Sequence, residues 1–201
     1  MTRTFPVSNH FSSLQRSLYD TVHRAHTRAV DMVAPGVRFL DIHLAASRVL
    51  VDGLKDVGFM KGNTDDAVAA GAHTLFFQCG LGHMIGLDVH DMENLGEPLV
   101  GYTDTLAKST AFGLKSLRLG KELEPGYGIT IEPGIYVIPH LIQMRKAEGA
   151  YADYIDYTFT EKHADAGGIR IEDDYIVTSE GAQLLGEPLE RSADEIEALR
   201  S

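Results

Sequence analysis

The sequence predicts an α+β fold in which helices pack on a curved sheet. Apolar residues recur at helical spacing in the first third of the chain, whereas short apolar runs bounded by glycine and proline dominate afterwards. At 201 residues the chain is long enough for one sizeable domain and short for two, with no internal repeat or flexible linker. We therefore expect residues 1–201 to form a single domain.

The expected helices begin where a serine, aspartate or threonine can accept hydrogen bonds from free backbone amides. Apolar residues then follow on one face, and a Pro-Gly pair or a glycine ends the run. The sequence predicts helices starting at Ser12 or Ser13, at Asp41 and at Thr64, the first ending at Pro35-Gly36, and a closing helix over 192–200.

The expected strands follow, each rich in β-branched or aromatic residues and bounded by turn-forming residues. They span residues 74–78, 127–132, 134–138 and 169–177. Two of them carry glutamates, Glu132 and Glu172, within otherwise apolar runs.

The composition excludes several classes of partner. The chain has 18 Lys and Arg against 29 Asp and Glu, a formal net charge of −11. An acidic surface repels nucleic-acid phosphates, and no polybasic cluster is available for anionic membranes. The longest uncharged stretch is interrupted by glycines and histidines, and the single cysteine allows no internal disulfide. With no signal peptide visible, we expect a cytoplasmic protein without nucleic-acid or membrane partners.

Glycines and histidines concentrate between Cys79 and Asp91. The glycine spacing misses the dinucleotide-binding fingerprint by one residue, so a backbone that approaches a crowded site is the better interpretation. His83 and His90 lie seven residues apart and can reach one cavity from an extended segment. Taken alone, each histidine is more typical of an ordinary structural residue.

Glu132 and Glu172 each require a partner if their strands are buried, because an unpaired buried charge is strongly destabilising. The simplest partner is Arg170, through a salt bridge. A more specialised partner is a metal ion, held by the two glutamates and His83. Carboxylates with imidazole suit catalytic Mn²⁺, Co²⁺, Fe²⁺ or Zn²⁺ better than a structural thiolate site.

Three segments together resemble one family. They are Gly80-Leu-Gly-His-Met-Ile-Gly-Leu-Asp-Val-His-Asp91, Thr130-Ile-Glu-Pro-Gly-Ile-Tyr136 and Gly168-Ile-Arg-Ile-Glu-Asp-Asp174. The set is similar to the pita-bread metallopeptidases, which include Xaa-Pro aminopeptidases, prolidases and methionine aminopeptidases. The Leu-Asp-Val-His-Asp form resembles the proline-specific branch, and the match runs over essentially the whole chain.

The resemblance implies a pita-bread fold and hydrolysis of Xaa-Pro bonds in di- or oligopeptides by a water that two divalent metal ions activate. By motif position the metal ligands are His83, Glu132 and Glu172, with Mn²⁺ the first expectation and Co²⁺, Zn²⁺ or Fe²⁺ as alternatives. Glu132 and His90 are the expected catalytic residues, Glu132 as proton acceptor and His90 at the scissile carbonyl. A homodimer is a further expectation.

His90, Arg118 and Arg170 are the expected substrate-binding residues. The segment Ser116-Leu117-Arg118 is similar to the prolidase segment whose arginine binds the substrate carboxylate, which a guanidinium fork can hold through two hydrogen bonds. The alternative for Arg118 is an ordinary surface charge. Tyr136, Phe76 and Phe77 are candidates for lining a proline pocket.

Two features depart from the family pattern. The two aspartate ligands of the family precede the position of Met1, so we expect this chain to be the C-terminal part of a catalytic domain and inactive alone. Cys79, expected to be a small buried residue, stands where proline-specific relatives commonly have a histidine.

The alternative functional class is a metal-free pita-bread module that acts as a binding scaffold. A metal-free hydrolase of the creatinase kind is a third possibility.

Overall fold

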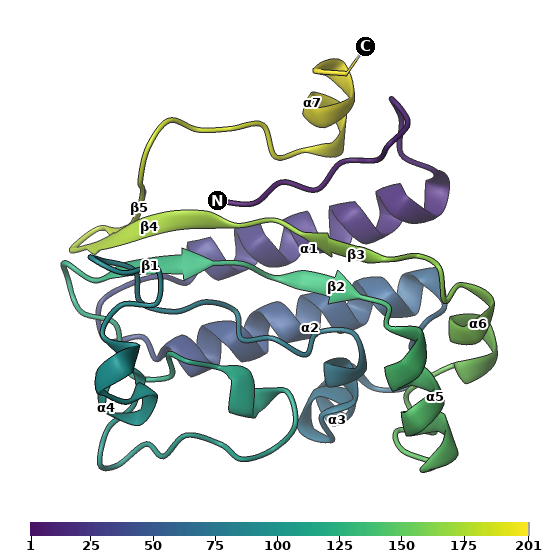
Figure 1. Cartoon of the computed structure of the whole chain (residues 1–201), viewed down its shortest axis with the longest axis horizontal. Helices are drawn as coiled ribbons and strands as arrows, with labels where there is room; N and C mark the ends of the chain where they lie inside the picture. Colours follow the sequence, from purple (N-terminus) through teal and green to yellow (C-terminus); the bar gives the residue numbers. More distant parts are fainter. Residues whose placement is uncertain (201) are drawn as a thin grey trace.

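The computed structural model describes residues 1–200 and confirms the α+β class. Two long helices, α1 (Ser13–Asp31) and α2 (Phe39–Val57), lie behind a twisted ribbon of strands (Figure 1). α1 packs against α2 and against strands along the ribbon. The apolar faces of both helices and the inner faces of the strands form one continuous core.

The first helix begins as expected. The hydroxyl of Ser12 accepts a hydrogen bond from the backbone amide of Gln15, and the Ser12 amide donates to the side-chain oxygen of Gln15. The prediction that Asp41 caps α2 is wrong, because that helix begins at Phe39. Asp41 lies in the first turn and accepts two hydrogen bonds of 2.8 Å from the guanidinium of Arg38.

The prediction of a strand over residues 74–78 is wrong as well. A short 3₁₀ helix, η1 (Ala72–Leu75), takes its place after α3 (Thr64–Ala69). The Thr74 amide and hydroxyl both donate to the carbonyl of Gly71, so this apolar run satisfies its backbone locally. A short buried apolar run suits either structure, and its periodicity cannot distinguish them.

Five strands form the ribbon: β1 (Gly128–Ile131), β2 (Gly134–Tyr136), β3 (Gly168–Arg170), β4 (Asp173–Thr178) and β5 (Gly181–Leu184). All pairs are antiparallel; β1, β4 and β5 form one sheet and β2 pairs with β3 in another. The expected strand 169–177 is therefore divided in two, and β5 was not expected.

The two sheets meet at a break in the ribbon. Pro133, which has no amide hydrogen to donate, separates β1 from β2, and Ile171 and Glu172 separate β3 from β4. At the break Glu172 pairs instead with Thr2, through two backbone hydrogen bonds of 3.0 Å. Three segments distant in sequence thus converge at this point.

A fourth segment, residues 81–85, runs beside β1. The amides of Thr130 and Glu132 donate to the carbonyls of His83 and Leu81, at 3.0 and 2.7 Å. The approach is so close that a Cβ atom on Gly82 would overlap the carbonyl oxygen of Thr130. The requirement for glycine here explains part of the glycine-rich motif, as the sequence indicated.

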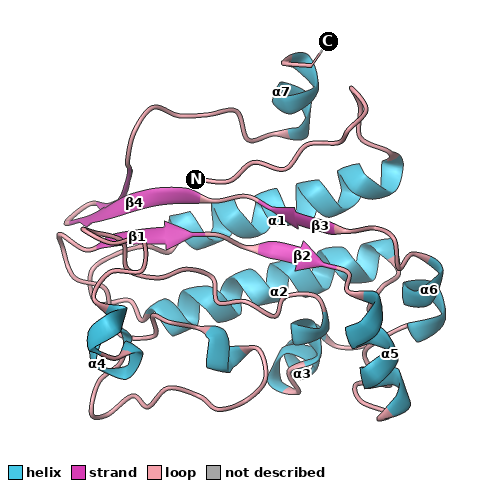
Figure 2. Cartoon of the chain, in the orientation of Figure 1, coloured by secondary structure: helices cyan, strands magenta, loops and turns pink. Residues whose placement is uncertain are grey.

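Shorter elements surround this framework: η2 (Glu93–Leu95), α4 (Glu97–Gly101), η3 (Leu114–Ser116), α5 (Pro139–Ala147), α6 (Tyr157–Lys162) and α7 (Ala193–Ala198). Figure 2 shows that α4 lies in a region dominated by loops, whereas α5 and α6 lie at the opposite end of the ribbon. Among residues 1–200, no helix is long and apolar enough to cross a lipid bilayer.

Two neighbouring histidines lie inside the core, in addition to the buried His26 on α1. His43 on α2 and His73 on η1 are 1% and 2% exposed, with ring centroids 6.4 Å apart. Burial lowers the pKa of His43 to about 3 and that of His73 to about 4. Both are neutral in the folded chain at neutral pH, whereas in the unfolded chain they gain protons below the ordinary pKa of 6.5.

We therefore expect the free energy of unfolding to fall as the pH decreases from about 6.5, because the unfolded state binds protons that the folded core excludes. Between about pH 7.5 and about pH 5, His43→Leu should remove about 2 kcal/mol of this loss. Urea unfolding at both pH values measures it, with the exposed His140→Leu as the control. Equal pH dependence in His43→Leu and the unmodified chain would contradict the assignment.

Candidate functional site

The break in the ribbon places His83 beside Glu132. The Nε2 atom of His83 lies 3.4 Å from Oε1 of Glu132. Its other ring nitrogen, Nδ1, lies 2.8 Å from the carbonyl oxygen of Met84, a contact that orients the ring with Nε2 toward the carboxylate. The backbone amide of His83 also donates to the hydroxyl of Thr130. Contacts at both ring nitrogens thereby fix the orientation of the His83 imidazole.

Glu132 is a mostly buried carboxylate with several partners. The hydroxyl of Thr130 donates to it at 3.2 Å, and Arg170 lies 3.3 Å from its second oxygen. Burial, reinforced by the nearby charge of Glu172, raises the pKa of Glu132 to about 7. The environment therefore disfavours an uncompensated negative charge here, and any additional cation would stabilise the carboxylate.

Glu172 lies across the break from Glu132, and Arg170 lies between them. The Arg170 guanidinium is 3.6 Å from Glu172 and also donates to the hydroxyl of Thr2. Thr2 in turn donates to the Glu172 carboxylate. The salt bridge between Arg170 and Glu132, the simpler alternative from the sequence, is thus present, and it extends to both glutamates.

His90 reaches the same place from an exposed loop. Its ring stands edge-on to that of His83, with centroids 4.3 Å apart. Partial burial and the neighbouring His83 and Arg118 lower its pKa, which keeps the imidazole neutral near pH 7. Two histidines from one glycine-rich segment therefore share one cavity, as their spacing suggested.

Arg118 lies on the opposite wall and is already paired. Its guanidinium contacts the carboxylate of Glu93 and lies 3.5 Å from that of Glu97, which also contacts Lys108. Lys115 lines the same cavity and forms no ion pair within residues 1–200. The cavity wall thus offers one paired and one unpaired cation.

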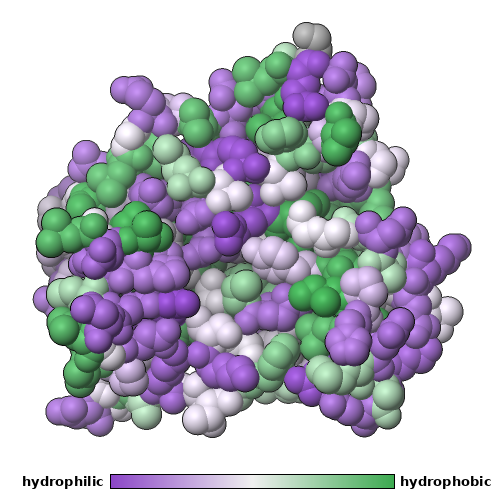
Figure 3. Space-filling view, viewed as in Figure 1, coloured by the Kyte–Doolittle hydropathy of each residue, from purple (hydrophilic) through white to green (hydrophobic). Residues whose placement is uncertain are grey.

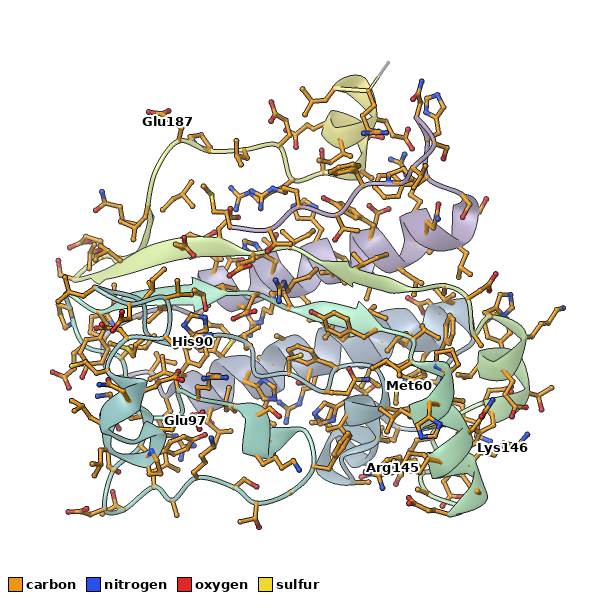
Figure 4. All side chains as sticks on the ribbon, viewed as in Figure 1. Met60, His90, Glu97, Arg145, Lys146 and Glu187 are labelled. Carbon is orange, nitrogen blue, oxygen red and sulfur yellow. The ribbon has the colours of Figure 1, made fainter. Side chains whose placement is uncertain are left out.

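The residues enclose a cavity of about 480 Å³. Its position is marked by His90 and Glu97 in Figure 4, and hydrophilic side chains cover much of this side of the face shown in Figure 3. The lining residues are Gln78, Cys79, Gly80, Gly82, His83, His90, Glu97, Lys115, Ser116, Arg118 and Glu132.

Several expectations need correction. Phe76 and Phe77 are buried in the core and do not line this cavity, nor does Tyr136. Cys79 is exposed rather than buried, because it lies on the cavity wall. Sequence reasoning missed Glu97 and the role of Thr2, whose contacts depend on chain segments far apart in sequence.

The donor atoms suit a divalent cation in their chemistry. One imidazole nitrogen and two carboxylates are ligands typical of catalytic Mn²⁺ or Zn²⁺, and the raised pKa of Glu132 shows the need for positive charge. Within residues 1–200, however, no three His, Cys, Asp or Glu side chains are arranged to hold one cation together. The assignment of His83, Glu132 and Glu172 as metal ligands therefore stays a prediction.

Comparison with known proteins gives concordant matches. The human Xaa-Pro dipeptidase is 35% identical over 198 residues, covering 98% of this chain and 38% of that protein. A probable Xaa-Pro aminopeptidase of Verticillium alfalfae is 34% identical over 197 residues, covering 98% of this chain and 41% of that protein. This chain therefore spans about 40% of the length of these relatives.

Solved structures agree. Aminopeptidase PepP of Pseudomonas aeruginosa matches with a TM-score of 0.71 and 32% identity. The zinc-substituted aminopeptidase P of Escherichia coli in complex with product matches with a TM-score of 0.72 and 32% identity. Both matches cover 98% of this chain and 37% of the other, and the shared architecture is the pita-bread fold.

The family model for metallopeptidase family M24 matches residues 1–179, which include every motif discussed above. The chain belongs to metallopeptidase family M24.

Proposed function

We propose that this chain supplies the C-terminal part of the active site of a metal-dependent Xaa-Pro peptidase, acting on proline-containing di- or oligopeptides. The observation that carries the proposal is the 3.4 Å contact of His83 with Glu132 and the linkage of Glu132 to Glu172 through Arg170 at the ribbon break, beside a cavity large enough for a short peptide. Its relatives among the Xaa-Pro dipeptidases and aminopeptidases support the same class of substrate.

In this proposal His83, Glu132 and Glu172 hold the divalent cation. A bound cation of this kind lowers the pKa of a water molecule and so supplies a nucleophile near neutral pH. Glu132 would accept the proton of the attacking water and donate it to the departing proline nitrogen. His90, at the mouth of the cavity, hydrogen-bonds the scissile carbonyl. Manganese as the ion and the cytoplasm as the location are further parts of the proposal.

Arg118 and Lys115 would face the carboxylate end of a short substrate. Because Arg118 already pairs with Glu93 and Glu97, a substrate carboxylate would compete with these two glutamates for the guanidinium. Arg170 would act more indirectly, by neutralising Glu132 and Glu172 at the floor of the site.

A metal-free scaffold is the competing function. Arg170 already compensates both glutamates without a cation, an arrangement that such a scaffold could retain. The two functions differ in whether the cavity binds a divalent ion, and this difference can be measured on the chain itself.

We expect the chain to bind one Mn²⁺ or Co²⁺ ion weakly, and His83→Ala to lower the affinity at least about tenfold, because a ligand is removed. Paramagnetic changes in NMR spectra during Co²⁺ titration measure this. The exposed His140→Ala removes an imidazole outside the cavity and is the control. Equal Co²⁺ affinity in the two variants would favour the scaffold.

We expect little or no hydrolysis of Xaa-Pro dipeptides by the 201-residue chain with added Mn²⁺ or Co²⁺. A two-metal site pins both ions with several carboxylates, and no three-donor cluster lies within the described residues. A coupled proline-release assay measures turnover. Robust turnover that Glu132→Gln abolishes would refute the expected inactivity while supporting the peptidase assignment.

A longer form of the protein, if the reading frame extends upstream of Met1, allows a test of Arg118. A charge-assisted hydrogen bond to the substrate carboxylate contributes about 1.5–3 kcal/mol. Arg118→Ala should then lower kcat/KM for Xaa-Pro dipeptides by about one to two decades, with a much smaller effect on amidated dipeptides. Equal losses on both substrates would show that Arg118 serves only its pairing with Glu93 and Glu97.

A further inference from the structure

The N-terminal segment, residues 1–11, lies between the ribbon and the C-terminal segment, residues 185–200. In Figure 1 the first residues run alongside β3 and β4, and the segment that ends in α7 passes over their other side. Polar contacts join the two chain ends: Glu197 accepts a hydrogen bond from the amide of Phe11, and Arg200 donates to the carbonyl of Val7. The C-terminal segment thus covers the N-terminal segment.

Arg3 is the centre of this arrangement. Its guanidinium forms five hydrogen bonds, a number equal to the donor capacity of arginine. The acceptors are the carbonyls of Thr2 and Glu172, each at 2.9 Å, the carbonyls of Leu189 and Glu190 at 3.3 and 2.7 Å, and the Asp173 carboxylate at 2.7 Å. The side chain is only 11% exposed.

Two of these acceptors belong to the residues that define the ribbon break. Arg3 holds the backbone of both Thr2 and Glu172, which are themselves joined by two backbone hydrogen bonds. The Thr2 hydroxyl then donates to the carboxylate of Glu172. Arg3 therefore constrains the glutamate through its backbone and, by way of Thr2, through its side chain.

The carboxylate of Asp173 binds the guanidinium of Arg3. It is 1% exposed, and besides Arg3 it lies 3.4 Å from both the imidazole of His26 on α1 and the guanidinium of Arg191. An aspartate this deeply buried requires cationic partners, and arginine provides charge and directed hydrogen bonds together. Through these contacts Asp173 connects the C-terminal segment, β4 and α1 at one point.

We infer that Arg3 is a positioning residue, which fixes Glu172 in the site by joining Thr2, Glu172 and the C-terminal segment at Leu189–Glu190. Its significance for catalysis rests on the proposed function, whereas the positioning itself does not. The C-terminal segment therefore belongs to the support of the site, although no residue of it lines the cavity.

Hydrogen exchange of individual amides, followed by NMR in the full 201-residue chain, tests this inference. Arg3→Lys keeps the charge beside Asp173, but a single ammonium cannot reach five dispersed acceptors. The amide of Glu172 should then exchange about tenfold to a hundredfold faster, while Val22 and Leu50 in the buried helices keep their protection. Arg3→Gln, which also removes the charge, should give a larger local effect.

Arg16→Gln is the matched control, because Arg16 joins α1 to Asp194 and Glu197 of the C-terminal segment without touching Glu172. It should leave the Glu172 amide unchanged. Unaltered protection of Glu172 in Arg3→Lys would overturn the inference, as would equal loss of protection at Glu172, Val22 and Leu50. Amide exchange requires neither metal nor substrate, so its outcome is independent of whether the peptidase proposal holds.

Discussion

Two carboxylates, those of Glu132 and Glu172, face one another across a break in the strand ribbon, and their charge must be compensated. Both are largely buried, at 13% and 14% exposure, and their mutual repulsion adds to the cost of removing them from water. Arg170 lies between them and supplies one positive charge for two negative ones. Burial, reinforced by the remaining negative charge of Glu172, raises the pKa of Glu132 to about 7.

The surrounding structure can be understood from this constraint. Pro133 has no amide hydrogen and interrupts the hydrogen-bond ladder. Strand β1 therefore ends immediately before Glu132. Thr2 completes the ladder opposite Glu172, and the segment around His83 completes it beside β1. Gly82 permits that second approach, because any side chain there would overlap Thr130. The buried charges and the pairing of distant chain segments thus occur at the same interruption of the strands.

The sequence predicted the parts of this arrangement that depend on local pattern. The cap at Ser12, the strands around Glu132 and the family motifs were all identified, because caps, alternation and turn residues act over a few positions. The start of α2 was misjudged because Asp41 satisfies Arg38 instead of the helix terminus. The apolar run after Ala72 was misjudged because burial alone does not select strand over helix.

The contacts around the site that sequence reasoning missed are long-range. The pairing of Arg118 with Glu93 and Glu97 and the fivefold bonding of Arg3 depend on how distant segments are brought together. Neither has a signature in residue spacing. The sequence did offer Arg170 as the ion-pair partner of Glu132, whereas the partners of Arg118 and Arg3 required the fold.

The proposed function requires the ribbon break to bind a divalent cation. The most direct test is a crystal structure of the chain grown with Mn²⁺, in which anomalous diffraction locates the ion. We expect an anomalous peak coordinated by the Nε2 atom of His83 and the carboxylate of Glu132, with Arg170 displaced from its position between the two glutamates. Anomalous peaks confined to surface carboxylates, with Arg170 still between Glu132 and Glu172, would contradict it.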